Sequence, residues 1–128
     1  EAVGFPLSRF ASDVAYLKGA AEAIPAADDY FDAVLSVNAL DHVDDLPAAA
    51  AEISRVLKPG GLLRMQIHYH PKTTCEPWSI DDALMAELFA GLALEKIHQE
   101  PLANRSDEFY TVWTTPLPIP SPSQGAGR

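Results

Sequence analysis

The stretch "FDAVLSVNALDHVDDLPAAAAEISRVLKPGGLLRMQIHYH", residues 31–70, carries the clearest structural signals of the chain. Its run DAVLSV (32–37) is almost continuously apolar, which is typical of a strand buried on both faces of a sheet. A helical pattern follows, and LLRMQI (62–67) is a second apolar run. This order predicts two parallel strands joined by a helix, with the loop NALDHV (38–43) at the carboxyl end of the first strand, where ligands bind in such sheets.

A helix is predicted over residues 46–57, because its apolar side chains recur at i, i+3, i+4, i+7, i+10 and i+11 and share one face. Asp44 and Asp45 stand at its start, where carboxylates can cap free amides. Pro59 and the Gly60-Gly61 pair follow it, which predicts that the helix stops there and the chain reverses.

Weaker patterns predict the remaining elements. These are a strand at 14–17, a helix at 80–90 capped by Ser79, and strands at 94–99 and 109–115. The polar loop PLANRSDE (101–108) favours antiparallel pairing of the last two strands. The alternation of strands and helices predicts an α/β fold in three layers, with helices on the faces of a mostly parallel sheet.

Length and composition limit the range of possible functions. The 128 residues suffice for one domain, expected at 1–115, and the proline-rich stretch 116–128 predicts a disordered tail. The net charge of -9 disfavours nucleic acid and anionic membranes as partners and is compatible with a small-molecule substrate. The single cysteine, Cys75, excludes an internal disulfide and fits a cytoplasmic location. The chain begins at Glu1 and not at Met, so we expect a fragment or a processed product.

Three correctly spaced pieces resemble class I methyltransferases that use S-adenosylmethionine: VAYLKGAAEAIP (14–25), FDAV (31–34) and RVLKPGG (55–61). The resemblance covers about residues 14–70. It implies a partial Rossmann-like sheet whose last strand is antiparallel, and methyl transfer from S-adenosylmethionine to a small molecule. Such a transfer depends mainly on positioning, which agrees with the lack of an evident acid–base pair.

The resemblance also implies site residues. The cofactor would contact the adenine loop, with Ala20, Ala21, Glu22 and Ile24, and the loop after the first buried strand, with Asn38, Ala39 and His42. His42 is expected to support its loop by hydrogen bonding, and the adenine loop is alternatively a turn packed under a helix. The side chains expected to face the substrate are His68, Tyr69, His70 and Trp78, although Trp78 alternatively packs at a helix entrance.

The chain also departs from the family pattern. No three of its seven glycines have the spacing of the glycine-rich cofactor loop, Ala20 replaces a usual Asp, and the acidic residue that binds the ribose is missing. We therefore expect this chain alone to bind S-adenosylmethionine weakly or not at all. The alternative function is a non-catalytic methyltransferase-like fragment or interaction module.

Two further alternatives stay open. Without a neighbour on one side, the strand at 32–37 would have an open edge, which either the strand at 14–17 or a second chain would cover as a homodimer. A zinc site from His68, His70, Cys75 and Glu76 is conceivable, but its spacing matches no familiar motif, so no metal ligand is assigned.

Overall fold

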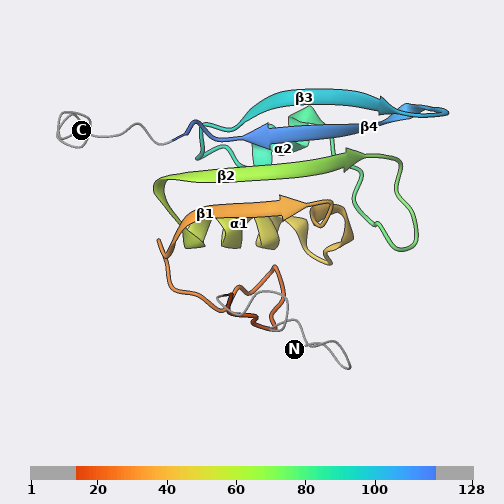
Figure 1. The fold of residues 1–128 in the computed structure, drawn as a ribbon. Helices are drawn as coiled ribbons and strands as arrows, with labels where there is room; N and C mark the ends of the chain where they lie inside the picture. The colour runs from red at the N-terminus through yellow and green to blue at the C-terminus, as the bar shows by residue number, and fades with distance from the viewer. Residues whose placement is uncertain (1–13, 118–128) are drawn as a thin grey trace, which may run out of the picture.

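The computed structural model describes residues 14–117, a four-stranded sheet with two helices (Figure 1). The elements are β1 (Phe31–Val37), the 3-10 turn η2 (Leu40–His42), α1 (Leu46–Val56), β2 (Leu57–Tyr69), α2 (Asp82–Leu88), β3 (Glu95–Leu102) and β4 (Arg105–Thr114). The predicted strand at 14–17 is wrong, because these residues form no strand. Expectations for residues 1–13 and 118–128 lie outside the described residues.

The sheet has the strand order β1-β2-β4-β3 (Figure 1). β1 pairs with β2 in parallel, and β4 pairs antiparallel with both β2 and β3. β1, β2 and β3 therefore run in one direction and β4 runs against them, which confirms the expected α/β sheet with an antiparallel last strand. Among the described residues only β2 pairs with β1, so residues 14–17 do not cover its other edge.

Helix α1 follows from its sequence pattern. The Asp45 carboxylate accepts a hydrogen bond from the Ala48 amide at 3.0 Å and so caps the first turn, and Pro47 lies where no amide is needed. The apolar stripe is buried as expected: Leu46, Ala49, Ala50, Ile53 and Val56. Val56 ends the helix, and the chain enters β2 directly at Leu57. Pro59 to Gly61 thus lie within a strand irregularity, where Gly60 adopts a φ of 75°.

The second half of the chain differs in detail from expectation. Asp81, and not Ser79, caps α2 by accepting a hydrogen bond from the Leu84 amide at 2.8 Å. The Ser79 hydroxyl donates instead to the His70 carbonyl at 2.8 Å. β3 and β4 extend to a tight turn in which Asn104 has a φ of 65°, so most of the predicted loop is strand.

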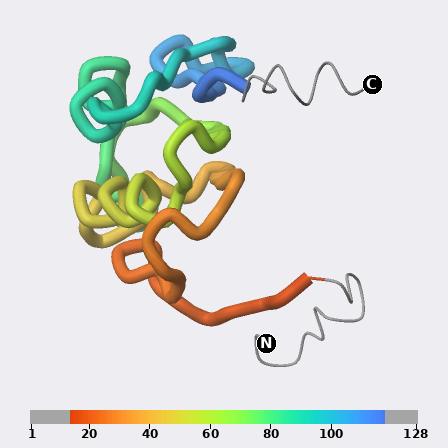
Figure 2. Tube along the Cα trace, turned by 90° about the vertical axis from the view of Figure 1, so that its left-hand side faces the viewer, coloured from red at the N-terminus to blue at the C-terminus, as the bar shows by residue number. Residues whose placement is uncertain are grey.

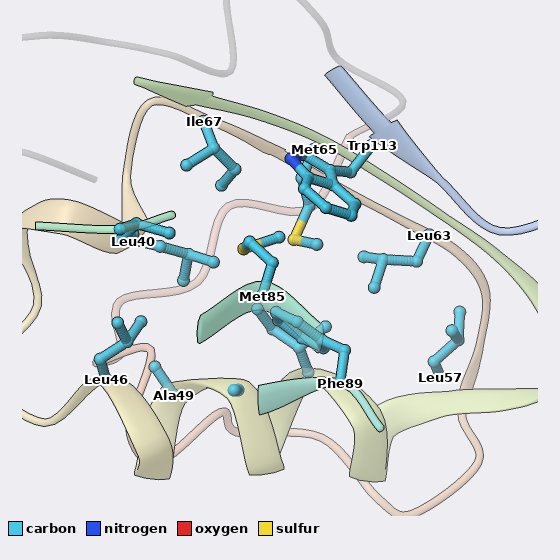
Figure 3. Packing of buried hydrophobic residues seen from close by; sticks show 13 residues of the cluster. Leu40, Leu46, Ala49, Leu57, Leu63, Met65, Ile67, Met85, Phe89 and Trp113 are labelled. Atoms are coloured by element: carbon cyan, nitrogen blue, oxygen red, sulfur yellow. The ribbon is translucent and has the colours of Figure 1, made fainter. Parts of the chain in front are cut away.

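Both helices pack on the same face of the sheet. Leu63, Met65 and Ile67 alternate along β2 and point toward Met85 of α2 and Phe89 just after it, with the α1 stripe beside them (Figure 3). Figure 2, which views the chain from its side, shows both helices on one side of the strands. The three-layer arrangement is therefore wrong for the described residues, which form two layers. No helix of the described part is long and apolar enough to cross a membrane.

Candidate functional site

The carboxyl ends of β1 and β2 meet at one edge of the sheet because the two strands are parallel. The chain leaves β1 at Val37 and forms η2, which carries Asp41, while β2 ends at Tyr69 just before His70. His70 Nε2 lies 2.6 Å from Asp41 Oδ2, and both side chains are only 3% exposed. A buried histidine–carboxylate pair thus connects the ends of the two strands.

Further polar groups surround the His70 ring. Its Nδ1 donates to the Pro71 carbonyl at 2.6 Å, and its Nε2 also lies 3.2 Å from Glu76 Oε2. Burial of the ring opposes its charging, but the Pro71 carbonyl and the carboxylates of Asp41 and Glu76 outweigh this and raise the pKa of His70. In this environment a positive charge on or beside the ring is favoured.

His68 stands next to His70, with ring centroids 4.7 Å apart. Its Nε2 lies 2.9 Å from Glu108 Oε1 on β4, and Arg105 donates to the other oxygen of Glu108 at 2.7 Å. Arg105 is the main cause that lowers the pKa of Glu108, with His68 adding to the effect against the burial of the carboxylate. Glu108 is therefore held as a carboxylate.

A cavity of about 780 Å³ opens between the end of β2 and the β3–β4 turn. It is lined by His68, His70, Pro71, Thr73, Glu76, Leu102, Asn104, Arg105, Ser106, Asp107 and Glu108. The predicted rim residues His68 and His70 both line it. A polar cavity at the carboxyl end of a parallel strand is where an α/β fold binds small molecules.

The two other predicted substrate residues point elsewhere. The Tyr69 hydroxyl donates to Asp82 at 2.6 Å, and burial together with that carboxylate raises the pKa of Tyr69. The indole of Trp78 donates to the Val43 carbonyl at 2.9 Å and packs against the core. Neither residue lines the cavity, so Trp78 follows the alternative of packing before the helix.

The predicted adenine loop is fastened to α1. Glu52 accepts from the Ile24 amide at 2.9 Å, and Arg55 donates to the carbonyls of Ile24 and Ala26. One oxygen of Glu22 accepts from the amides of Asp44 and Asp45, at 3.0 and 3.2 Å. These contacts hold Glu22 beside the start of α1, near Asp41, and hold Ile24 and Ala26 beside the end of the helix.

The adenine loop also borders a second, mainly apolar groove of about 830 Å³. Ala20, Ala21 and Ile24 line this groove together with Tyr30 and Phe31, while Glu22 does not. Ile24 packs against the core and also borders this open groove, and the adenine contact of the loop stays a prediction.

The loop after β1 contains the remaining predicted cofactor contacts. Asn38 has a φ of 50°, and its buried Oδ1 has no hydrogen-bond partner among the described residues. Ala39 is exposed and starts η2. His42 is half exposed, and its Nε2 is 3.7 Å from Asp41 and 3.8 Å from Glu76. The His42 side chain thus lies at the edge of the His70 cluster without a hydrogen bond to the described residues, while its backbone N–H donates to the Ala39 carbonyl at 3.1 Å.

Sequence reasoning missed Asp41 and Glu108. Asp41 precedes the predicted His42 by one residue, and only the 3-10 turn decides which of the two points inward. Glu108 belongs to a stretch predicted as loop, and its place beside His68 follows from the β2–β4 register. Cys75 is exposed and lies outside the cluster.

Comparisons with known proteins agree with this architecture. Residues 5–65 match the family model described as "Methyltransferase domain". The ubiquinone/menaquinone biosynthesis C-methyltransferase UbiE of Shewanella oneidensis is 44% identical over 52 residues, which are 41% of this chain and 21% of that protein. The methyltransferase YcgJ of Bacillus subtilis is 34% identical over 71 residues, which are 56% of this chain and 28% of that protein.

Solved structures show the same fold. The YcgJ crystal structure has a TM-score of 0.70 at 18% identity and covers 86% of this chain and 76% of that one. The 1,6-didemethyltoxoflavin-N1-methyltransferase of Burkholderia thailandensis, solved with bound 1,6-didemethyltoxoflavin and S-adenosylhomocysteine, has a TM-score of 0.62 at 17% identity, and the match covers 86% of this chain and 54% of that one. Each curated match spans only about a fifth to a quarter of the relative, 21% and 28%. Residues 5–65 thus resemble a methyltransferase domain in sequence, and the described residues share the fold of solved methyltransferases.

Proposed function

We propose that the protein containing this chain transfers a methyl group from S-adenosylmethionine to a small molecule in the cytoplasm. The observation that carries the proposal is the cavity of about 780 Å³ at the carboxyl end of β2, beside the loop that follows β1. Ligands of open α/β sheets bind at this place. The single cysteine and the acidic net charge of -9 fit a cytoplasmic enzyme whose substrate is neither nucleic acid nor membrane.

The described residues fit part of the cofactor. The Asn38 Oδ1 is buried without a partner among them and can accept a hydrogen bond from the cofactor's amino-acid end. Ala39 follows it and is exposed. The groove bordered by Ala20, Ala21 and Ile24 offers an apolar wall for a ring, and Glu22 secures this wall through its bonds to the start of α1. Residues to cradle the cofactor's carboxylate and to bind its ribose are missing from the sequence pattern.

The bound cofactor supplies a methyl group on a sulfonium sulfur, an electrophile that needs no acid to activate it. The task of the chain is then to position the acceptor and exclude water. His68 and His70 line the cavity, and their rings are oriented by Glu108 and by the Pro71 carbonyl. We expect these two rings to contact the acceptor, with Tyr69 and Trp78 holding the surrounding elements in place.

Binding of the cofactor by this chain alone should be weak. Three expected contacts are missing, and each would contribute about 1 to 3 kcal/mol, where 1.4 kcal/mol corresponds to tenfold in affinity. We therefore expect residues 1–128 to bind S-adenosylmethionine roughly 100-fold or more weakly than the complete gene product. A second polypeptide would also be needed to cover the open edge of β1. For residues 1–128 alone, we propose that this polypeptide is a second copy of the chain, which makes a homodimer.

Calorimetry with S-adenosylmethionine on both the complete gene product and residues 1–128, followed by a labelled-methyl transfer assay, tests the function. We expect micromolar binding and transfer for the complete product, and a clear loss of affinity on Asn38→Ala. Micromolar binding by residues 1–128 would contradict the weak-binding proposal. A complete product that binds no cofactor would contradict catalysis.

The second candidate is a non-catalytic methyltransferase-like module. The observation that favours it is the exposed apolar surface of β1, where Leu35 and Val37 are 71% and 66% exposed. Exposed apolar surface of this kind marks a contact with another polypeptide. A complete product without cofactor binding that forms a stable complex through β1 would establish this alternative.

A further inference from the structure

We propose that Asp41, His68, His70 and Glu76 bind a divalent transition-metal ion, with Zn²⁺ as the best-fitting ion. One possible ligand atom from each of the four side chains lies within 4.8 Å of all the others. His68, His70 and Glu76 come from the end of β2 and the segment that directly follows it, and Asp41 comes from η2. Two segments that are distant in the sequence therefore converge on one point.

The tautomers of both histidines are set for metal binding. His70 Nδ1 faces the Pro71 carbonyl at 2.6 Å, and since a carbonyl can only accept, this nitrogen carries the hydrogen. His68 Nε2 faces the Glu108 carboxylate at 2.9 Å and carries its hydrogen in the same way. Each ring then keeps one unprotonated nitrogen. A ligating histidine usually donates its other nitrogen to a backbone carbonyl or carboxylate, as both rings do here.

The charges of the cluster call for a cation. In the neutral form of His70, its Nε2 lone pair faces Asp41 Oδ2 at 2.6 Å and Glu76 Oε2 at 3.2 Å. This contact between a lone pair and two carboxylates is repulsive unless a proton or a metal ion lies between them. Asp41 and His70 are 3% exposed, so water does little to relieve the repulsion. Two neutral imidazoles and two carboxylates would balance the charge of one divalent ion.

The ligand set favours zinc among the common ions. Zn²⁺ accepts imidazole nitrogen and carboxylate oxygen at about 2.0–2.2 Å in a tetrahedral arrangement. The four ligand atoms can reach this geometry by shifts on the order of 1 Å, in which His70 and Asp41 separate and the wider pairs approach. Glu108 stays outside this set because Arg105 already neutralises it, at 2.7 Å. The cluster lines the cavity at His68, His70 and Glu76, so the ion would be reached from solvent.

Titration of metal-free residues 1–128 with Co²⁺, a spectroscopic substitute for Zn²⁺, tests the site without any activity measurement. We expect one equivalent of Co²⁺ to give visible d–d bands of tetrahedral intensity, and Zn²⁺ to abolish them. Glu76→Gln and His68→Gln should each weaken the binding roughly tenfold or more. His70 is avoided because its buried ring could be needed for folding, and circular dichroism verifies the fold of each variant.

Two matched controls come from the same chain. Cys75→Ser removes the only thiol and His98→Ala removes an exposed histidine of β3, and both should leave the Co²⁺ spectrum and affinity unchanged. Absence of the bands would overturn the proposal and leave a proton on His70 as the compensating charge. Binding that survives in both ligand variants, or that is lost in Cys75→Ser or His98→Ala, would also overturn it, because other residues would then hold the ion.

Discussion

The two faces of the sheet are built from the same strands but differ in chemistry. On the face covered by α1 and α2, Leu63, Met65 and Ile67 of β2 are buried. On the opposite face β2 presents Arg64, Gln66 and His68, whereas β1 presents Leu35 and Val37, which are 71% and 66% exposed. β2 therefore follows the apolar–polar alternation of a half-covered strand, while β1 has the composition of a strand covered on both faces. The difference indicates that β1 is the part of the described fold that lacks its neighbours.

The largest effect should come from placing the same charge on each face. Ile53→Asp would bury an unpaired carboxylate in the contact of α1 with the sheet, since Ile53 is only 5% exposed. We expect it to lower the free energy of unfolding by about 3–5 kcal/mol, measured by chemical denaturation. Leu35→Asp, on the open face, should change it by less than about 0.5 kcal/mol at high dilution, where the chain is monomeric.

The pair of variants separates the effect of a residue's surroundings from the effect of the residue type. Both residues are apolar and each receives the same carboxylate, so a difference in stability reports only the surroundings. Similar losses in the two variants would mean that the open face of β1 is covered in solution. A loss below about 0.5 kcal/mol for Ile53→Asp would mean that the α1 stripe is not buried.

A smaller, local effect is expected where the adenine loop meets α1. Arg55 is the main cause that lowers the pKa of Glu52, and the Ile24 amide adds to it. A lowered pKa means that the contribution of Glu52 is present above the ordinary pKa of a glutamate and is lost as pH falls through the lowered value. The amide resonance of Ile24, followed by NMR, should therefore shift with a midpoint below the ordinary value.

Glu52→Gln is the matched control for this titration, because glutamine keeps the shape and the oxygen acceptor without the ionisable group. The Ile24 resonance should then lose its acidic transition, and the rest of the spectrum should change little. A transition that persists in this variant would come from another carboxylate. The titration reports directly on the contact between the loop and α1, since Glu52 and Arg55 both lie near the end of this helix.

Local patterns predicted the first half of the fold well. The stripe of α1 and the apolar runs of β1 and β2 each depend on neighbours in sequence, and all three elements formed as expected. The strand at 14–17 failed because its apolar pattern requires a partner strand that the described residues do not offer. Ser79 failed as a cap because Asp81, two residues later, offers a competing carboxylate.

The site was predictable only in part. That His68 and His70 share a face followed from the alternation of a strand, and their rings are indeed adjacent. Their partners Asp41 and Glu108 come from other elements and depend on the parallel register of β1 and on the β3–β4 turn. Sequence spacing suggested Cys75 as a zinc ligand, but the loop after β2 brings in Glu76 and leaves Cys75 exposed.

Changes to the exposed side chains of β1 should have the smallest effect on stability and a clear effect on dimer formation. The outer edge of β1 has no partner strand among the described residues, and Leu35 and Val37 are exposed on the open face of the same strand. An apolar edge of this kind pairs with another strand, so we expect residues 1–128 to form a homodimer through β1. Light scattering over a range of concentrations should detect it.

The double variant Leu35→Lys and Val37→Lys should be monomeric, because lysines on an edge strand oppose pairing through their charge and their need for water. Its free energy of unfolding should stay within about 0.5 kcal/mol of the parent at high dilution, since both side chains are exposed there. Ile97→Lys is the matched control, because Ile97 is a 51% exposed apolar residue on β3, at the opposite edge of the sheet. If association depends on β1, this control remains dimeric. A parent chain that is monomeric up to millimolar concentration, or a control that dissociates in place of the double variant, would show that the β1 edge does not form the dimer.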